Sequence, residues 1–507
     1  MASEYKHAKE AFVSNLTGGS ISEINKVALV APVNLSSFFS PKPLTHYRQA
    51  SVVLWSVLQS KRSLFTPYTR LACLIDFLLN GVAILLATTL YSLSPVLLNT
   101  MLVLPAVLAI TPSLLPAIRR ARQFKHIAEY PNFVSPQNQP DPFPIKPFVT
   151  TYRGTMMVIT CVAILAVDFK VFPRRFAKTE NWGTSLMDLG VGSFVFSAGT
   201  VSARPILKQS LANTSNSLGS RLYAAGRHAL PLLVLGIIRL YSVKGLDYAE
   251  HVSEYGVHWN FFFTLALLPP FVAMFDAAFS FVPSYAALAL LLGVSYEIVL
   301  KFTNLKGFIL IAPRTNFLSK NREGVFSFLG YLAIFLAGQA TGMYTLPRNQ
   351  RTHSPWRNPI LGQLAIWSAL WSLLFFLSTD FRFGFGLQVS RRLANLPYIL
   401  WVVAFNCCQL TLFCGIETFI FNDIYKARGN TTEKKRIREA SSPFLRAFNR
   451  NGLAIFLLAN LITGLVNLTL PTLRMSDLQA TAVLLAYIAT LGIVALALDV
   501  KNISIKL

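Results

Sequence analysis

The chain has 507 residues, of which 53% are apolar and 13% are charged, whereas about 25% of a typical soluble domain is charged. So little charge excludes an ordinary cytosolic enzyme, a disordered regulator and a fibrous repeat. A net charge of +24 suggests nucleic-acid binding in a soluble protein. In a membrane protein, however, basic residues gather in cytoplasmic loops and contact lipid headgroups. The composition therefore predicts a polytopic membrane protein.

Twelve apolar segments are long enough to cross a bilayer, which takes about 20 helical residues. They lie approximately at 71–91, 95–118, 149–167, 184–203, 222–242, 258–281, 284–303, 325–346, 360–380, 397–421, 452–471 and 478–500. We therefore predict an all-α polytopic fold in which residues 1–507 form one transmembrane domain.

The region before these segments is unusual. Residues 27–33 and 51–59 are apolar but too short to span, and the stretch 34–50 between them is polar and contains two prolines. Without residues 34–50 the flanks join into a thirteenth span, so we interpret this insert as an error in the gene model. If the insert is real, the first helix must break or hide its backbone polar groups from lipid.

Thirteen spans divide the loops into two alternating sets. One set holds more lysine and arginine than the other, so the positive-inside rule predicts that it is cytoplasmic. It consists of 60–70, 119–148, 204–227, 347–359, 422–451 and the C-terminal tail, with the basic loops 119–148 and 422–451 the most prominent. The N-terminus is then expected in the lumen and the C-terminus in the cytoplasm.

The other set of loops is richer in mixed polar motifs. Four of its segments together supply acidic, basic, aromatic and glycine residues: DFKVFPRRFAKTENWG (168–183), DYAEHVSEYGVHWN (247–260), NREG (321–324) and SRRLANLP (390–397). Because alternating loops meet at the same side of the membrane, we expect these segments to line one chamber.

Asp168 is the first candidate for chemistry, because a carboxylate at the end of a long apolar helix is costly unless it is paired or functional. Four cations follow it within ten residues: Lys170, Arg174, Arg175 and Lys178. One interpretation is a general base with a cationic partner. The alternative is a cluster of opposite charges that caps the end of the helix.

The second candidate stretch places His251 and His258 beside Glu250 and Glu254. Histidine is a common general base near neutral pH. The spacing is not HExxH and the five cysteines form no CxxC pair, so no metal site is predicted. The alternative is a hydrogen-bonded interfacial loop.

Arginines dominate the remaining two segments, and a guanidinium suits phosphate or carboxylate groups. Such arginines also bind the phosphates of ordinary lipids at an interface. The residues that we predict to contact substrate are Arg174, Arg175, His251, Glu254, Asn260, Asn321, Arg322, Glu323, Arg391, Arg392 and Asn395.

Charged residues also occur within the predicted spans, where they usually face the bundle interior. They are Asp76, Asp188, Arg239, Asp276, Glu297 and Glu417, and the same set fits a proton-coupled transporter or a lipid flippase. Transporters often contain two related halves, and no internal repeat is visible here.

Several blocks of the sequence closely resemble the fungal GPI-anchored wall transfer proteins and their animal counterparts, the phosphatidylinositol-glycan class W proteins. The blocks are GGSISEIN (18–25), AVDFKVFPRRFAKTENWGTSLMDLGVGSFVF (166–196), EHVSEYGVHWNFFFTL (250–265), NREGVFSFLGY (321–331), SRRLANLPY (390–398) and LLANLITGLVNLT (457–469). The resemblance covers essentially the whole chain outside residues 34–50.

The resemblance implies a multi-pass acyltransferase of the endoplasmic reticulum membrane. This family moves the acyl group of a fatty acyl-CoA, typically palmitoyl, to the inositol of glucosaminyl-phosphatidylinositol during synthesis of the GPI anchor. It also implies thirteen spans with the shared segments in the lumen. The expected partners are these two substrates and membrane lipids, with acyl-CoA as co-substrate, no bound cofactor and no nucleic acid.

The resemblance places the catalytic pair at Asp168 and Lys178. We expect Asp168 to act as the general base, with His258 as the alternative base. Lys178 is expected to stabilise the oxyanion or to hold Asp168 ionised, and the sequence does not separate these two roles. The sequence departs from the family at one nearby position, where Lys170 replaces the proline of the usual AVDFP. This lysine adds a cation two residues from the expected base.

Overall fold

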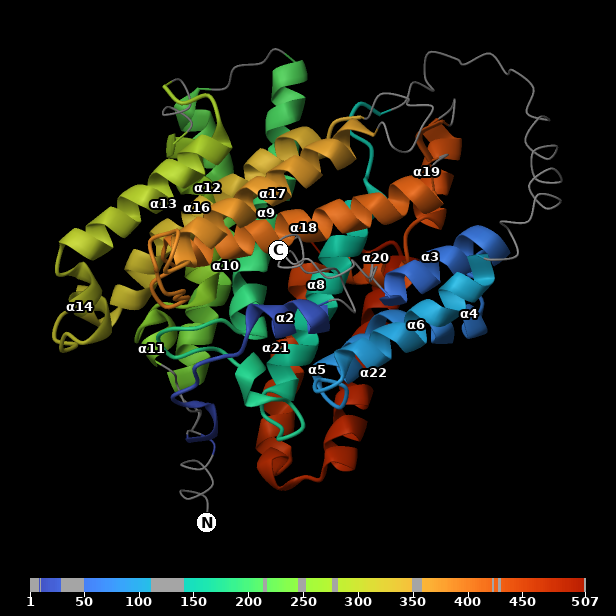
Figure 1. Cartoon of the computed structure of the whole chain (residues 1–507), viewed down its shortest axis with the longest axis horizontal. Coiled ribbons are helices and arrows are strands. Elements are labelled where there is room, and N and C mark those ends of the chain that lie inside the picture. Colours follow the sequence, from blue (N-terminus) through green and yellow to red (C-terminus); the bar gives the residue numbers. More distant parts are fainter. Residues whose placement is uncertain are drawn as a thin grey trace.

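The structure, a computed structural model, describes Lys9 and residues 11–28, 50–110, 141–212, 217–244, 252–275, 281–348, 358–421, 424–426 and 430–505. Within these ranges every element is a helix, and one isolated bridge joins Gly18 to Thr184 (Figure 1). For the described residues, the prediction of an all-α polytopic fold is confirmed.

Ten helical segments among the described residues are long and apolar enough to cross a membrane. They are Arg70–Thr88 (formed by α4, Arg70–Phe77, η2, Leu78–Val82, and α5, Ala83–Thr88), α8 (Pro147–Ala166), α9 (Leu186–Leu211), α10 (Leu218–Lys244), α13 (Tyr285–Phe302), α16 (Arg322–Thr345), α17 (Pro359–Thr379), α18 (Leu396–Ile420), α21 (Gly452–Thr469) and α22 (Asp477–Val500). Two shorter apolar helices are α6 (Pro95–Ile110) and α12 (Phe261–Phe275). Each of the twelve predicted segments therefore overlaps an apolar helix.

Short helices complete the described chain. They are α2 (Ile21–Ala28), α3 (Ala50–Arg62), η5 (Arg174–Phe176), α11 (Val252–Tyr255), α14 (Leu305–Leu310), α15 (Phe317–Lys320), η8 (Ile424–Lys426), α19 (Asn430–Glu439), α20 (Pro443–Arg450) and η9 (Thr472–Arg474). The 13 residues of α3 extend about 20 Å, which is less than the hydrocarbon core of about 30 Å. Residues 34–49 of the predicted insert lie outside the described residues, so the thirteenth span stays a prediction.

The centre of the bundle is the close crossing of α9 and α16. A Cβ atom built on Gly338 of α16 would lie 2.2 Å from the carbonyl oxygen of Phe196 in α9, and one on Gly342 would lie 2.2 Å from that of Thr200. Small residues four positions apart allow two membrane helices to approach this closely. As a result α16 is the most deeply buried of the ten spans.

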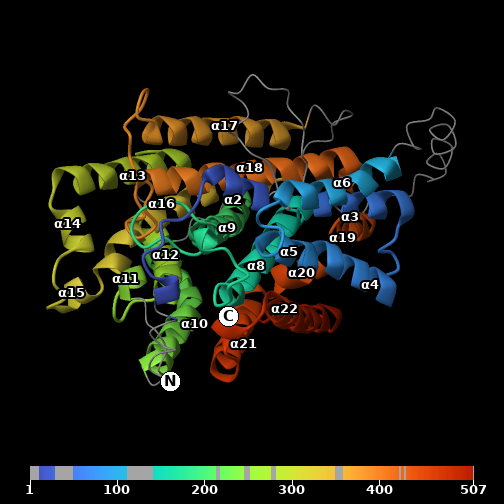
Figure 2. The ribbon, with the colours of Figure 1, turned by 60° about the horizontal axis from the view of Figure 1, so that its bottom comes forward.

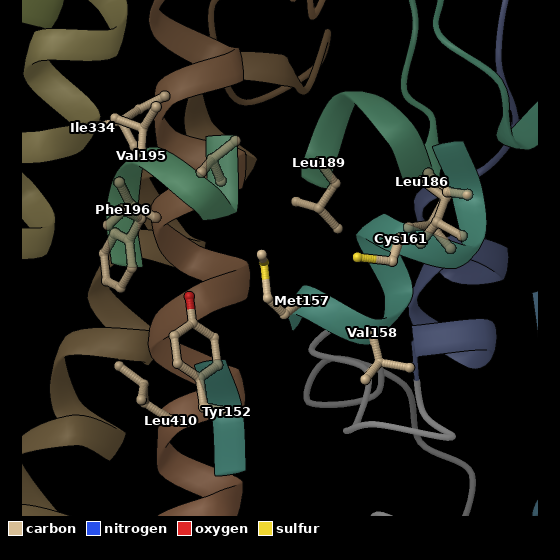
Figure 3. Close-up of a cluster of buried hydrophobic side chains, with 14 of the residues drawn as sticks. Tyr152, Met157, Val158, Cys161, Leu186, Leu189, Val195, Phe196, Ile334 and Leu410 are labelled. Carbon is tan, nitrogen blue, oxygen red and sulfur yellow. The ribbon is translucent and has the colours of Figure 1, made fainter. Parts of the chain in front are cut away.

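Apolar side chains fill the space between α8 and α9. Figure 3 shows Met157 and Cys161 of α8 pointing toward Leu189 of α9, and all three are buried in the main hydrophobic cluster. In contrast, α17 and α10 lie at the outside and bury little of their apolar surface, with α17 stacked along α18 (Figure 2). Outward apolar faces of this kind suit contact with lipid.

The loops gather at two ends of the bundle. Helices α11 and α14 lie at one end in both views, with α15 beside α14 in Figure 2, and α3, α4 and α19 lie at the other end (Figures 1 and 2). We call the first the polar end; it contains residues 11–28, 167–185, 252–260, 303–321 and 380–395. At the opposite end, Arg348 donates to Glu433 and to the carbonyl oxygen of Asp141. These contacts agree with the predicted division for the loops that they join, while the complete division and the side of the membrane on which each set lies stay predictions.

Candidate functional site

The loop at residues 167–185 ties the polar end together. The backbone nitrogen of Gly183 donates to the carbonyl oxygen of Val389, and that of Gly19 donates to Thr184. Gly18 has a φ of +79°, and a Cβ atom there would lie 2.2 Å from the carbonyl oxygen of Thr184. Only glycine fits this approach, so the glycine pair fastens the N-terminal segment to the loop.

A buried ion pair joins this loop region to the loop before α18. Arg391 donates through Nε to Asp188 at 2.6 Å, and both side chains are almost fully buried. The same carboxylate accepts hydrogen bonds from Ser185 and from the backbone and hydroxyl of Thr179. Tyr398 donates to the carbonyl oxygen of Asp188. The carboxylate is therefore satisfied by donors of the protein itself.

A second buried carboxylate, Glu323 at the start of α16, collects arginines from two loops. Arg314 binds it through both terminal nitrogens, at 2.5 and 3.0 Å, and Arg392 donates to it at 2.8 Å. Arg392 also donates to the side chain of Asn181 at 2.7 Å. Glu323 therefore links the 303–321 and 380–395 loops, and Arg392 links both of them to the 167–185 loop.

Asn321 connects the 252–260 loop to the same assembly. Its side-chain oxygen accepts hydrogen bonds from the backbone nitrogens of His258 and Trp259, at 2.8 and 3.0 Å. The imidazole ring of His258 stacks on Phe317. Contacts join the described parts of the four chemically dense segments, and residues 11–28 join them as a fifth. A chamber between these segments stays a prediction.

Asp168 follows the end of α8 and faces α21. Its Oδ2 accepts a hydrogen bond from the side-chain nitrogen of Asn467 at 2.7 Å, while no described residue donates to its Oδ1. Burial raises the pKa of Asp168, whereas the bond from Asn467 and the charges of Lys9 and Arg174 lower it. The carboxyl is therefore a shielded group with one oxygen open to a further donor.

Lys178 belongs to a neighbouring cluster of the polar end. Its ammonium pairs with Glu254 of α11 at 2.8 Å, and its side chain is 31% exposed. The next residue, Thr179, binds Asp188. The predicted catalytic pair thus lies on one loop, with Asp168 bonded to α21 and Lys178 to α11.

Arg174 and Arg175, which lie between Asp168 and Lys178 in the sequence, have partners within the protein. Arg174 donates to the carbonyl oxygens of Val167, Phe169 and Phe172, and burial lowers its pKa to about 10. Arg175 pairs with Glu23 of α2 at 2.5 Å. Both residues therefore hold the shape of the loop that carries Asp168. Lys170 is exposed.

The remaining predicted contacts are placed as follows. Asn260 accepts from the backbone nitrogens of Phe262 and Phe263 at the start of α12, and Asn395 accepts from that of Ser390 before α18. Arg322 donates to the carbonyl oxygen of Ala312. His251 lies outside the described residues. Substrate contact by any of the predicted residues stays a prediction.

Sequence reasoning missed several members of the polar end. Lys9 and Asn467 belong to the surroundings of Asp168, and Asn181, Arg314 and Glu23 pair with residues that were predicted. A signal existed for Asn467, Glu23 and Asn181, because all three lie in blocks that carry the family resemblance. Lys9 lies outside those blocks, and nothing in its neighbours along the chain points to Asp168.

The helical architecture and its ten candidate spans define a multi-pass membrane protein. The family model described as GWT1 matches residues 5–498. GPI-anchored wall transfer protein 1 of Gibberella zeae is 54% identical over 99% of each chain, and that of Aspergillus oryzae is 53% identical over 100% of each. The protein of that name in Saccharomyces cerevisiae is 39% identical, again over 100% of each chain. The chain therefore belongs to the GWT1 family.

Proposed function

We propose that this protein is an acyltransferase of the endoplasmic reticulum membrane that acts in GPI-anchor synthesis. It transfers a fatty acyl group, palmitoyl by resemblance to the family, from acyl-CoA to the inositol ring of glucosaminyl-phosphatidylinositol. Family membership supports the class of reaction. We further propose thirteen spans, with the polar end in the lumen and the basic loops in the cytoplasm.

The observation that carries the proposal is the burial and hydrogen bonding of the Asp168 carboxylate. Its pKa is raised by burial, which brings a carboxylate closer to the basicity that general-base catalysis needs near neutral pH. Its Oδ2 is held by Asn467, and its Oδ1 accepts nothing from the described residues. This oxygen is therefore available to a substrate hydroxyl.

The reaction balances with this one base. Oδ1 of Asp168 takes the proton of the inositol hydroxyl as the hydroxyl oxygen bonds to the thioester carbonyl carbon. The carbonyl oxygen becomes an oxyanion, which the ammonium of Lys178 stabilises, with Glu254 fixing the position of that ammonium. The carbon–sulfur bond then breaks, and the coenzyme A thiolate receives the proton from Asp168. The products are the inositol ester and the free thiol.

The test uses the purified full-length protein in liposomes with labelled palmitoyl-CoA and glucosaminyl-phosphatidylinositol. Asp168→Asn is expected to lower the rate of acyl-inositol formation about 100-fold or more, because general-base catalysis contributes about 10²–10⁴. Asp477→Asn is the matched control, since Asp477 is an exposed carboxylate at the start of α22. Full activity of Asp168→Asn, or movement of substrate across the bilayer without product, would contradict the proposal.

A further inference from the structure

A chain of hydrogen bonds links Asp168 to the beginning of the sequence. The ammonium of Lys9 donates to the side-chain oxygen of Asn467 at 2.8 Å, and the side-chain nitrogen of Asn467 donates to Oδ2 of Asp168 at 2.7 Å. An ammonium can only donate and a carboxylate can only accept, so the two ends fix which way the amide points. Asn467 is thus a bridge between a cation and the carboxylate.

Asn467 occupies an unusual place for an amide. It lies in the last turn of α21, in the apolar sequence LVNLT. A polar side chain at such a position usually has a partner within the protein. Both of its polar groups are used in the bridge, so the contact with Asp168 accounts for the presence of this asparagine.

The other cations of the loop are engaged elsewhere. Arg174 lies close enough to influence Asp168, but its guanidinium donates to three backbone carbonyl groups and packs over the ring of Phe12 at 3.8 Å. Lys178 pairs with Glu254. Among the described residues, Lys9 is therefore the ammonium that acts on the carboxyl of Asp168.

We propose that Lys9 and Asn467 are positioning residues of the acyl-transfer site, through which the N-terminal segment holds Asp168 ionised and turns its Oδ1 toward the acceptor hydroxyl. This inference rests on the proposed function of Asp168 as the base. It gives the two lysines different roles. Lys9 stabilises the ionised form of Asp168, and Lys178 stabilises the oxyanion formed from the thioester.

The proposal predicts a definite change in the pH dependence of the reaction. The groups that face Asp168 are Asn467 from α21, Lys9 from the N-terminal segment and Arg174 from its own loop. Removing the charge of Lys9 takes away one influence that favours the ionised carboxylate. The pKa of Asp168 then rises, so a larger share of the base is protonated below the new pKa. The acidic limb of the kcat profile consequently moves to higher pH.

The experiment measures kcat and KM from pH 5 to 9 for the full-length protein in liposomes. Lys9→Met is expected to move the acidic limb upward by about one pH unit, which lowers kcat about tenfold on that limb and leaves the alkaline plateau and KM near wild type. Lys9→Arg should restore the wild-type profile, because the charge is kept. Lys26→Met is the matched control, since Lys26 is an exposed lysine of the same segment.

Asn467→Leu breaks the bridge from its other side and should move the limb in the same direction. An unshifted limb in Lys9→Met, or an equal loss of kcat at every pH in Lys9→Met and Lys9→Arg, would overturn the inference. A shift caused by Lys178→Met and not by Lys9→Met would also overturn it, by assigning the ammonium to Lys178. The activity of Asp168→Asn is measured separately. It tests whether Asp168 is the general base, and its result does not depend on the role of Lys9.

Discussion

At the scale of single residues, Arg391 and Asp188 form an ion pair although they lie 203 positions apart in the sequence. The pair is buried, and the carboxylate has several further donors. Bringing two charges out of water is costly, and removing one partner leaves the other unpaired in a medium of low dielectric constant. Substitution of either residue of this pair is therefore expected to destabilise the polar end.

We expect Arg391→Leu to lower the free energy of unfolding by about 3–5 kcal/mol, because it strands a buried carboxylate. The measurement is thermal unfolding of the purified protein in detergent. Arg382→Leu is the control, because Arg382 is an exposed arginine of the same loop. The double variant Asp188→Asn/Arg391→Leu should recover part of the loss. An unchanged midpoint in Arg391→Leu would show that the pair does not stabilise the fold.

The arginines show what a sequence can and cannot reveal at this scale. The charge and position of Arg391 and Arg392 indicate an anion beside them, and the structure supplies one for each, Asp188 and Glu323. A guanidinium binds a protein carboxylate and a lipid phosphate with the same geometry. The sequence therefore predicts that these residues meet an anion, but it cannot tell an internal partner from a substrate.

At the scale of elements, hydropathy alone locates the long apolar helices, because a lipid-exposed helix must be apolar along its length. Hydropathy is less accurate in predicting the residues at which these helices begin and end. The segment predicted at 258–281 begins as α12 at Phe261, where Asn260 accepts from backbone nitrogens of the first turn. The crossing of α9 and α16 depends on glycines that hydropathy does not distinguish from other small residues.

Gly338→Leu should weaken that crossing. A side chain at this position meets the backbone of α9, which cannot rotate away, so overpacking is expected to cost about 1–3 kcal/mol. The measurement is the thermal midpoint, together with the yield of monodisperse protein. Gly362→Leu in α17 is the matched control, because a Cβ atom there has no neighbour within 4 Å. Equal behaviour of the two variants would argue against a tight crossing.

At the scale of the whole molecule, the alternation of spans predicted which loops share an end. The contacts of Lys178 with Glu254 and of Arg392 with Asn181 and Glu323 follow that division. The pairing within an end could not be predicted, because it depends on how the helices tilt and which neighbours they choose. Lys9 is the clearest case, since a single charge near the start of a chain carries no periodic signal.

The orientation of the two ends is testable with acceptor sites for N-glycosylation. Asn430 begins an N-T-T sequon on α19 at the opposite end, and Asn430→Gln should leave the electrophoretic mobility unchanged. The substitutions Phe381→Asn and Phe383→Thr create a sequon in an exposed loop of the polar end. This double variant should gain one glycan that is sensitive to endoglycosidase. A glycan at Asn430 would reverse the proposed orientation.

The interlocking of five segments at the polar end has a consequence for how these proteins diverge. Arg392 binds Asn181 of another segment and Glu323 at the start of α16, and Gly18 leaves no room for any substituent beside Thr184. A chimaera that imports one of these loops from a relative must also import the residues to which that loop is bound. The unit that can be exchanged between relatives is consequently the complete set of five, although its members are spread over residues 11–395 of the sequence.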